Sequence, residues 1–238
     1  THIVPEGEGV KNDLQHYKVT KKTLKVLGHG NIKGIDVKRF DPELPELAAK
    51  AEKIRRKDIF TYIFIGRLVG DKGINELIKA FDQLNAQYPK TRLLLVGGFE
   101  NNLDPLDPET LRLMKKNKAI ESVGIQRDVR PWLLASDALV FPSYREGFPN
   151  VVIEAGAMGL PSIVTDINGS REIINDGVNG IIIPPRQSET LRQAMEIFVT
   201  DSSLLERMAS VARESVISRF EQGFVRQCLK DYYREIMK

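Results

Sequence analysis

Cysteine and long apolar runs are both scarce in this sequence, and each shortage excludes a class of protein. Cys228 is the only cysteine among 238 residues, which excludes an intrachain disulfide and a cysteine metal cluster. Its place in the apolar periodicity of the last expected helix favours a small buried side chain over a reactive thiol. The longest apolar runs, such as 137–141 before Pro142, are far too short to span a membrane. No signal peptide is visible, and we expect a cytoplasmic protein.

An excess of charge of either sign is lacking as well. Apolar residues make up 42% of the sequence and charged residues 28%, and the net charge is only +3. These values are typical of a soluble globular protein. So small a charge does not favour nucleic-acid or membrane binding. The basic clusters at 21–25, 55–57 and 115–118 are short enough to be solvated faces, and we expect no nucleic-acid partner.

Short apolar segments alternate with amphipathic ones from residue 59 onward. Leu77, Phe81 and Leu84 keep the spacing of a helix, whereas 92–96 and 137–141 are nearly unbroken apolar runs. This alternation predicts an α/β fold, in which helices cover both faces of a doubly wound parallel sheet. We expect strands at 1–4, 23–27, 62–65, 92–96, 120–123, 137–141, 161–165 and 180–183. We expect helices at 10–16, 47–57, 74–87, 108–117, 128–135, 151–158, 171–174, 189–199, 203–218 and 222–237.

The loop 66–73 is the first candidate for a binding site, because such sheets bind ligands beyond the carboxyl ends of their strands. It brings Arg67 and Lys72 to the start of the expected helix 74–87, where free N–H groups and the positive end of the helix dipole add to their charge. This combination predicts an anion site suited to a diphosphate. A set of solvated surface charges is the simpler alternative. The loop is not a phosphate-binding P-loop, because the glycine-lysine-serine/threonine ending is missing.

Two further loops carry weaker signals. Gly97 and Gly98 end an expected strand, where they allow either a close backbone approach or a plain turn. The polar loop 123–129 could form the wall against which a nucleobase lies, and a structural connector is an equally good interpretation.

The segment 143–154 carries the most information. Asn150 is a favourable N-cap for the expected helix that follows. Glu146 stands just before this helix and Glu154 about one turn inside it, and side chains lean toward a helix N-terminus. Carboxylates that accept bonds from two neighbouring hydroxyls can hold a ribose or a hexose. The alternative is that Glu154 only stabilises the helix dipole while Glu146 is solvated.

A dinucleotide site is not expected at 28–34. Gly28 and Gly30 follow an expected strand, but the third glycine of the fingerprint, Gly34, comes one residue late and no convincing helix follows. We therefore expect no nicotinamide or flavin cofactor.

Several motifs in a fixed order resemble those of the group 1 (family 4) glycosyltransferases. They are GRLVGDKG, LLLVGG, DVRPWLLASDALVFPS, EGFPNVVIEAGAMGLPSIVTD and PSIVTDINGSREIINDGVNGIIIPP. Glu146 and Glu154, with seven residues between them, match the signature spacing of the family. The similarity runs from about Val10 to Phe220 and is most like the bacterial capsular or cell-surface polysaccharide transferases.

The resemblance implies a GT-B fold, in which two Rossmann-like domains enclose the active site and the C-terminal one binds the donor. It also implies retention of anomeric configuration without a required metal or cofactor. Arg67 and Lys72 should hold the diphosphate, Glu146 the sugar and Glu154 the ribose, with 125–128 near the base. The implied catalytic residues are Glu146, Arg67 and Lys72. The implied donor-binding residues are Arg67, Lys72, Ile125, Glu146, Gly147, Phe148, Asn150, Val151 and Glu154.

The resemblance also divides the chain. Residues 1–35 match a remnant of the N-terminal acceptor domain and its linker, 36–220 the nucleotide-sugar-binding domain, and 221–238 a C-terminal cross-over helix. The chain starts at Thr1 without methionine, which indicates a piece cut from something longer. Contacts with a glycan or lipid-linked acceptor would then come from the missing domain, and the fragment should be nearly inactive alone. Peripheral membrane association of the full-length protein is left open.

Charge stabilisation is the mechanism that these residues favour. Arg67 and Lys72 can stabilise the diphosphate as it leaves through an oxocarbenium-like state, while Glu146 positions the sugar. Two alternatives remain open at this point. One is a sugar-nucleotide epimerase or phosphorylase of the same fold, and the other is a non-catalytic binding module.

Overall fold

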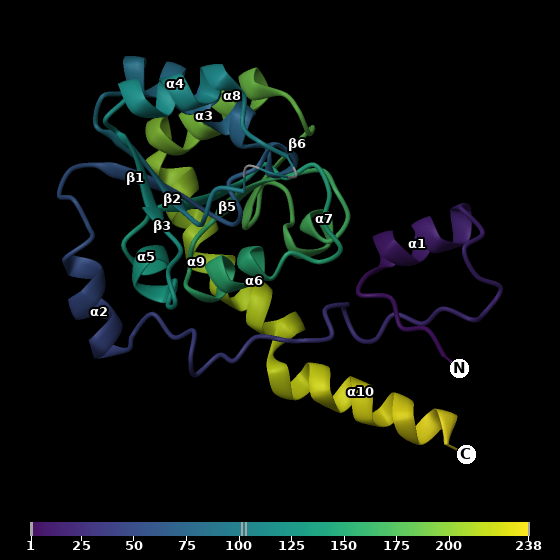
Figure 1. The fold of residues 1–238 in the computed structure, drawn as a ribbon. Coiled ribbons are helices and arrows are strands. Elements are labelled where there is room, and N and C mark those ends of the chain that lie inside the picture. The colour runs from purple at the N-terminus through teal and green to yellow at the C-terminus, as the bar shows by residue number, and fades with distance from the viewer. Residues whose placement is uncertain (1, 101, 103, 238) are drawn as a thin grey trace.

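The computed structural model describes residues 2–100, 102 and 104–237. Its centre is a six-stranded sheet in the order β3-β2-β1-β4-β5-β6, and all paired strands run parallel (Figure 1). The strands are β1 (Phe60–Ile65), β2 (Thr91–Val96), β3 (Ile120–Gly124), β4 (Ala138–Phe141), β5 (Ser162–Thr165) and β6 (Gly180–Ile183). Every residue of β2, β4 and β5 is buried, as expected for strands covered on both faces.

Helices cover both faces of this sheet, which confirms the doubly wound α/β fold. Figure 1 shows α3, α4 and α8 on one face and α5 and α6 on the other, with α9 packed on α6. The helices are α1 (Glu8–His16), α2 (Pro45–Glu52), α3 (Ile74–Gln87), α4 (Pro108–Lys116), α5 (Arg130–Leu134), α6 (Asn150–Ala157), α7 (Ser170–Ile173), α8 (Ser188–Thr200), α9 (Ser202–Phe220) and α10 (Gln222–Ile236). Leu77, Phe81 and Leu84 of α3 are fully buried, which explains their helical spacing in the sequence.

The strand order reverses between β1 and β4. From β1 the chain continues outward to β2 and β3, then returns to place β4 on the other side of β1. The loops that leave β1 and β4 diverge at such a point and leave a crevice beyond the carboxyl ends of the strands. The two loops with the strongest sequence signals, 66–73 and 142–149, follow these two strands.

Two expected strands near the N-terminus are wrong. The segments 2–4 and 23–27 are joined only by one isolated parallel bridge, between Ile3 and Leu24; Thr1 lies outside the described residues. The physical reason is that two short strands need a third strand or a covering layer to make a stable ladder. The helix expected at 128–135 is also shorter, because the Asp128 carboxylate accepts a bond from Arg130 N (3.2 Å) and caps the chain before the first helical turn.

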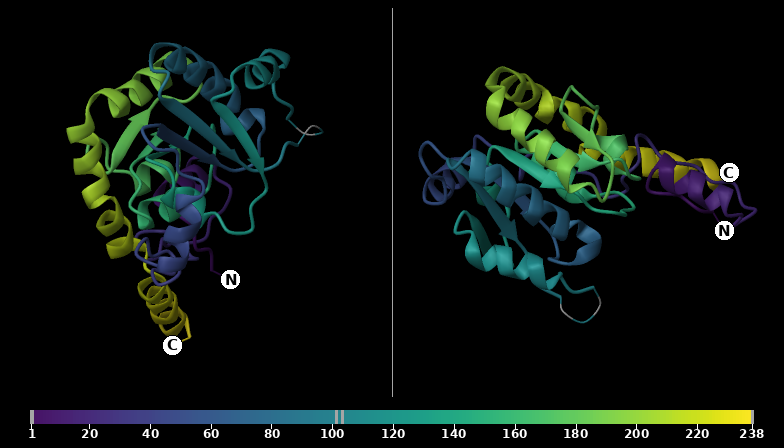
Figure 2. Two further views of the ribbon diagram at one scale, coloured as in Figure 1. Left: turned by 90° about the vertical axis from the view of Figure 1, so that its left-hand side faces the viewer. Right: turned by 90° about the horizontal axis from the view of Figure 1, so that it is seen from above.

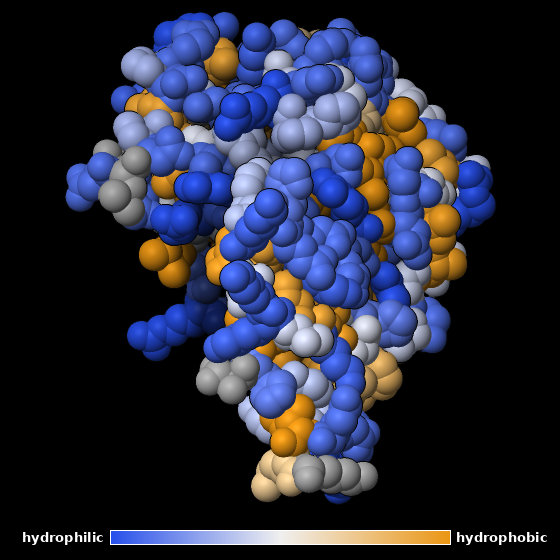
Figure 3. Space-filling view, turned by 90° about the vertical axis from the view of Figure 1, so that its right-hand side faces the viewer, coloured by the Kyte–Doolittle hydropathy of each residue, from blue (hydrophilic) through white to orange (hydrophobic). Residues whose placement is uncertain are grey.

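The N-terminal segment and α10 project from the same end of the molecule (Figure 2). Ile35 ties them to the domain, because Ile35 N donates to Phe220 O (2.7 Å) and Gln222 N donates to Ile35 O (2.9 Å). Apolar side chains of α10 are exposed: Phe224 by 41% and Tyr233 by 54%. Figure 3 shows apolar patches among hydrophilic side chains on the face that carries both chain ends.

Candidate functional site

The loop after β1 lies against the end of β4. It contains a short 3-10 helix, η1 (Gly70–Lys72), before α3 begins at Ile74. Gly73 joins the two with φ 71°, in the left-handed region that favours glycine, and a Cβ at this position would clash with the Pro142 carbonyl. This close approach brings Lys72 to the loop that follows β4.

Lys72 and Glu146 form the central contact of the site. Lys72 Nζ lies 2.5 Å from Glu146 Oε1, and the side chains are only 15% and 17% exposed. Ser143, which is fully buried at the end of β4, donates its hydroxyl to the same carboxylate oxygen (2.9 Å). The structure therefore unites a cation and a carboxylate that the sequence placed on separate loops.

A cavity of about 420 Å³ opens around this pair. The residues that line it are Arg67, Asp71, Lys72, Arg145, Glu146 and Gly147. Four of the predicted site residues, Arg67, Lys72, Glu146 and Gly147, thus share one cavity. Asp71 and Arg145 form its remaining wall and pair with each other at 3.2 Å. Its three cations and two carboxylates suit an anionic ligand that also carries hydroxyl groups.

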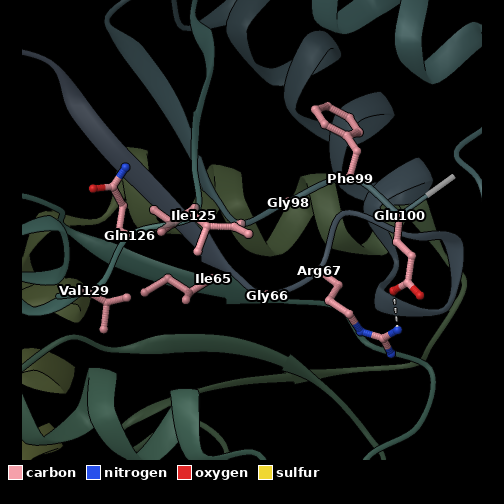
Figure 4. A pocket seen from close by; sticks show the side chains of 11 residues that line it. Ile65, Gly66, Arg67, Gly98, Phe99, Glu100, Ile125, Gln126 and Val129 are labelled. Atoms are coloured by element: carbon pink, nitrogen blue, oxygen red, sulfur yellow. Dashed lines mark hydrogen bonds and ion pairs between the residues drawn. The ribbon is translucent and has the colours of Figure 1, made fainter.

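Arg67 is more exposed than Lys72 and has a different partner. Its guanidinium is 56% exposed and lies 2.6 Å from Glu100, which follows β2 (Figure 4). The hydrogen bond that Arg67 donates to the Glu100 carboxylate raises the pKa of Arg67. Sequence analysis missed Glu100, because nothing local marks an acidic residue near Gly98 as the partner of Arg67.

Arg67 also lines a second cavity, of about 450 Å³, at the carboxyl ends of β1, β2 and β3. Figure 4 shows Ile65, Ile125 and Val129 around it, with Phe99 on another side. Ile125 is 81% exposed, which is unusual for a side chain of this size. The cavity is lined by Ile65, Gly66, Arg67, Val96, Gly97, Gly98, Phe99, Glu100, Ile125, Gln126 and Val129.

Ile125, Gln126 and Val129 of the loop 123–129 line this cavity together with Gly97 and Gly98. The predicted contact of this loop with a nucleobase stays a prediction. Asp128 is engaged elsewhere, because its carboxylate pairs with Arg130 at 2.7 Å. A flat apolar ring fits a mostly apolar cavity of this kind, and the cationic cavity begins at its rim with Arg67.

Glu154 lies on α6 and lines neither of these two cavities. Its carboxylate is 19% exposed and lies 3.9 Å from Lys33 Nζ, in the segment before α2. Burial raises the pKa of Glu154, and the charge of Lys33 opposes that shift. The predicted ribose contact of Glu154 stays a prediction.

The expected N-cap at Asn150 is wrong. Pro149 holds the cap position with φ −75° and ψ 102°, and Asn150 is the first residue of α6. Its Oδ1 accepts a hydrogen bond from Asn31 Nδ2 (3.0 Å) instead, so it ties the segment before α2 to the start of α6. Because the first N–H groups of a helix have no partner within it, the backbone at this end remains suited to an anion or a hydroxyl.

Phe148 and Val151 play structural parts through their side chains. Phe148 is 6% exposed, and its ring lies 5.5 Å from that of Phe220 in an edge-to-face arrangement. Val151 is partly buried against the core. No sequence signal indicates that Gly169, at φ 73°, packs against the backbone of 147–149, where a Cβ would lie 2.7 Å from Gly147 O. A side chain there would displace the loop that carries Glu146.

Comparison with known proteins identifies the family. The family model described as glycosyl transferases group 1 matches residues 47–215. The chain belongs to this family. It is 28% identical to the capsular polysaccharide biosynthesis glycosyltransferase CapM of Staphylococcus aureus, over 100% of this chain and 62% of CapM. It is 30% identical to the putative teichuronic acid biosynthesis glycosyltransferase TuaC of Bacillus subtilis, over 86% of this chain and 50% of TuaC.

Solved structures give the same fold for this glycosyltransferase chain. Anabaena Alr3699/HepE in complex with UDP superposes with a TM-score of 0.87 at 21% identity, over 98% of this chain and 64% of that one. WaaG, a glycosyltransferase of lipopolysaccharide biosynthesis, superposes with a TM-score of 0.78 over 94% of this chain and 60% of its own. The six-stranded sheet is thus a Rossmann-like domain of the GT-B type. The chain spans between half and two thirds of the length of these relatives.

Among residues 2–100, 102 and 104–237, no helix combines the length and the apolar composition needed to cross a bilayer.

Proposed function

We propose that this glycosyltransferase chain is the donor-binding part of a retaining hexosyltransferase that requires no metal or other cofactor. Its donor is a nucleoside diphosphate sugar, and its acceptor is a glycan or lipid-linked carbohydrate in the synthesis of a surface polysaccharide. The observation that carries this proposal is the contact between Lys72 and Glu146 in the cationic cavity. Arg67 lines both this cavity and the adjoining apolar one. The enzyme works in the cytoplasm.

The two adjoining cavities suit the two halves of such a donor. The apolar cavity beside Ile125 takes the base, and UDP, which is bound in the HepE structure, is the first candidate. The cationic cavity takes the diphosphate between Arg67 and Lys72. Charge-assisted hydrogen bonds to phosphate contribute about 1.5–3 kcal/mol each, which is enough to hold a ligand with two phosphates.

Catalysis follows from where the charge develops. When the bond between the anomeric carbon and the diphosphate oxygen breaks, the bonding electrons stay with the diphosphate and its negative charge grows. Lys72 and Arg67 are already fixed by Glu146 and Glu100, so little reorganisation is needed to stabilise this charge. Glu146 already accepts bonds from Lys72 and Ser143, which makes it a residue that positions sugar hydroxyls rather than a general base.

The roles of Glu154 and of the missing acceptor side complete the proposal. Glu154 accepts the ribose hydroxyls, and its pairing with Lys33 orients it. Acceptor contacts come from a second domain, since the chain spans 62% of CapM and half of TuaC. The 238-residue chain alone is therefore expected to bind donor but transfer little sugar.

Calorimetric titration of the chain with UDP and with GDP tests the proposal. We expect one of them to bind, and Arg67→Ala combined with Lys72→Met to abolish that binding. Melting without nucleotide verifies that the variant is folded. If neither nucleotide binds at millimolar concentration, a non-catalytic binding module is favoured. If a nucleotide sugar is epimerised without an acceptor, the chain is an epimerase of this fold.

A further inference from the structure

A further carboxylate, that of Glu6 in the N-terminal segment, lies beside Gly147 of the cationic cavity. A Cβ placed on Gly147 would lie 3.0 Å from Glu6 Oε2, so the Glu6 carboxylate lies against the residue next to Glu146. Gly147 itself lines the cavity that holds Lys72. Glu6 is 141 positions away from Gly147 in the sequence (147 − 6), and no motif marks it as part of this site.

The backbone around Glu6 is fixed rather than free. Asn31 N donates to Glu6 O (2.7 Å), and a Cβ on Gly30 would lie 2.5 Å from the same carbonyl oxygen. Asn31 also holds Asn150 at the start of α6 through its side chain (3.0 Å). Glu6 and the helix that follows the Glu146 loop are therefore positioned by the same linker residue.

Glu172 fixes the other side of this segment. Its Oε2 accepts a bond from Glu8 N (2.7 Å), and its Oε1 accepts bonds from Gly9 N (3.1 Å) and from Gly169 N (3.2 Å). A carboxylate at the N-terminus of a helix is stabilising because it binds free N–H groups and the positive end of the dipole. Glu172 thus joins the start of α1 to the glycine that packs under the 147–149 loop.

Glu6 differs from Glu146 and Glu154 in its charged neighbours. Glu146 and Glu154 each have a lysine within 4 Å, whereas Glu6 has no salt-bridge partner among the described residues and its side chain is exposed. A carboxylate accepts hydrogen bonds from hydroxyls. A free nucleoside diphosphate carries more negative charge than a nucleotide sugar and has no sugar hydroxyl to donate, so the Glu6 carboxylate favours the donor over the spent nucleotide.

We propose that Glu6 is a sugar-binding residue of this site, whose carboxylate accepts a hydrogen bond from a hydroxyl of the hexose that is transferred. This inference rests on the proposed function. It adds a residue from the N-terminal segment to a site otherwise built from the loops of the parallel sheet.

Paired titrations of the 238-residue chain test it. The probes are free UDP and GDP, and the UDP- and GDP-linked forms of glucose, galactose, mannose and N-acetylglucosamine. For Glu6→Gln we expect about tenfold weaker binding of the nucleotide sugar, from the loss of one charge-assisted bond. Binding of the free nucleotide should be unchanged or tighter, because a repelling charge is gone. A loss of affinity confined to the nucleotide sugar cannot arise from a general loss of structure.

Glu8→Gln is the matched control. Glu8 lies two residues away, and its side chain pairs with Lys11 at 2.9 Å on the surface. It should leave both affinities unchanged. Equal effects of Glu6→Gln on nucleotide and nucleotide sugar, or no effect on either, would overturn the inference while leaving the proposed function intact. The inference is also overturned if the unaltered chain binds a free nucleotide but none of the nucleotide sugars. If the unaltered chain binds neither UDP nor GDP, the proposed function itself fails.

Discussion

Lys72 Nζ and Glu146 Oε1 lie 2.5 Å apart and connect the loops that follow β1 and β4. The two strands are neighbours at the point where the strand order reverses, so this ion pair crosses the crevice of the sheet. Each side chain is at least four-fifths buried, so removing either charge would leave the other one buried and unpaired. The pair holds both loops in the arrangement that a diphosphate would meet.

Removing one member of this pair should separate its structural role from its role in binding. Lys72→Met leaves the buried Glu146 carboxylate without its cation, and we expect a loss of about 3 kcal/mol in the free energy of unfolding. Adding Glu146→Gln removes the stranded charge and should restore most of that stability. Nucleotide affinity should stay low in both variants. Urea unfolding and calorimetric titration measure the two effects, and a double variant that regains full affinity would contradict the diphosphate role of Lys72.

Arg67 should matter for binding but not for stability. Because it is 56% exposed, its pairing with Glu100 is screened by solvent and contributes little to stability. Arg67→Ala is therefore expected to keep the melting temperature while it weakens UDP binding about tenfold or more. Arg112→Ala is the matched control, because Arg112 is 59% exposed and pairs with Glu109 on α4 at 2.6 Å. Equal affinities of the two variants would exclude Arg67 from the site.

The apolar cavity can be tested with Ile125→Ala. Ile125 is 81% exposed, so its removal should leave stability nearly unchanged. The variant should bind UDP and uridine several-fold more weakly, since burial of apolar surface contributes roughly 25 cal/mol per Å². Val178→Ala, at an exposed valine in the loop before β6, is the control. If Ile125→Ala weakens UDP but not uridine, the cavity holds something other than the base.

Burial raises the pKa of Glu154 and so makes stability depend on pH. Between the ordinary value of 4.5 and the raised pKa, the folded protein binds more protons than the unfolded chain. Stability therefore falls as pH rises through this window, and the cost of the ionised carboxylate is fully present above it. Glu154→Gln removes this cost. As pH rises through the window, the free energy of unfolding of Glu154→Gln should increase relative to that of the unaltered protein, and the difference should then level off.

The affinity for UDP should rise with pH over the window in which stability falls, and Glu154 is again the residue responsible. Only an ionised Glu154 can accept bonds from two ribose hydroxyls, so UDP affinity should fall as pH drops below the raised pKa. In Glu154→Gln the affinity should be lower at neutral pH. The ratio of the two affinities cancels the titration of UDP itself. If this ratio stays constant with pH, Glu154 does not bind the ribose.

Gly73 should be required for the close approach of the loop 66–73 to the loop 142–149. Gly73→Ala faces a left-handed backbone, which costs about 1–2 kcal/mol, and in addition a clash with the Pro142 carbonyl. Gly159→Ala is matched in backbone, with φ 82°, but its Cβ would meet open space. We expect the Gly73 variant to lose clearly more stability and to bind nucleotide more weakly. Equal losses in urea unfolding would show that the loops can separate without cost.

Local patterns predicted the elements of the sheet well, because buried residues recur with helical spacing in helices and form short apolar runs in buried strands. The helix 74–87 and the strand 180–183 have the expected bounds. The N-terminal strands failed because apolar residues at 2–4 and 23–27 meet only in one bridge. The cap at Asn150 failed because its side chain is taken by Asn31, which is 119 residues away.

The fold class and the loops on which a site could form follow from the spacing of apolar, glycine and charged residues, so both were predictable from the order of amino acids. Which charges meet depends on the folded arrangement. Lys72 pairs with Glu146 across 74 residues, Arg67 with Glu100 across 33, and Glu172 holds α1 across 164. These pairings depend on the order of strands in the sheet and on the path of the N-terminal segment, which bring distant parts of the chain together in a way that no local spacing encodes.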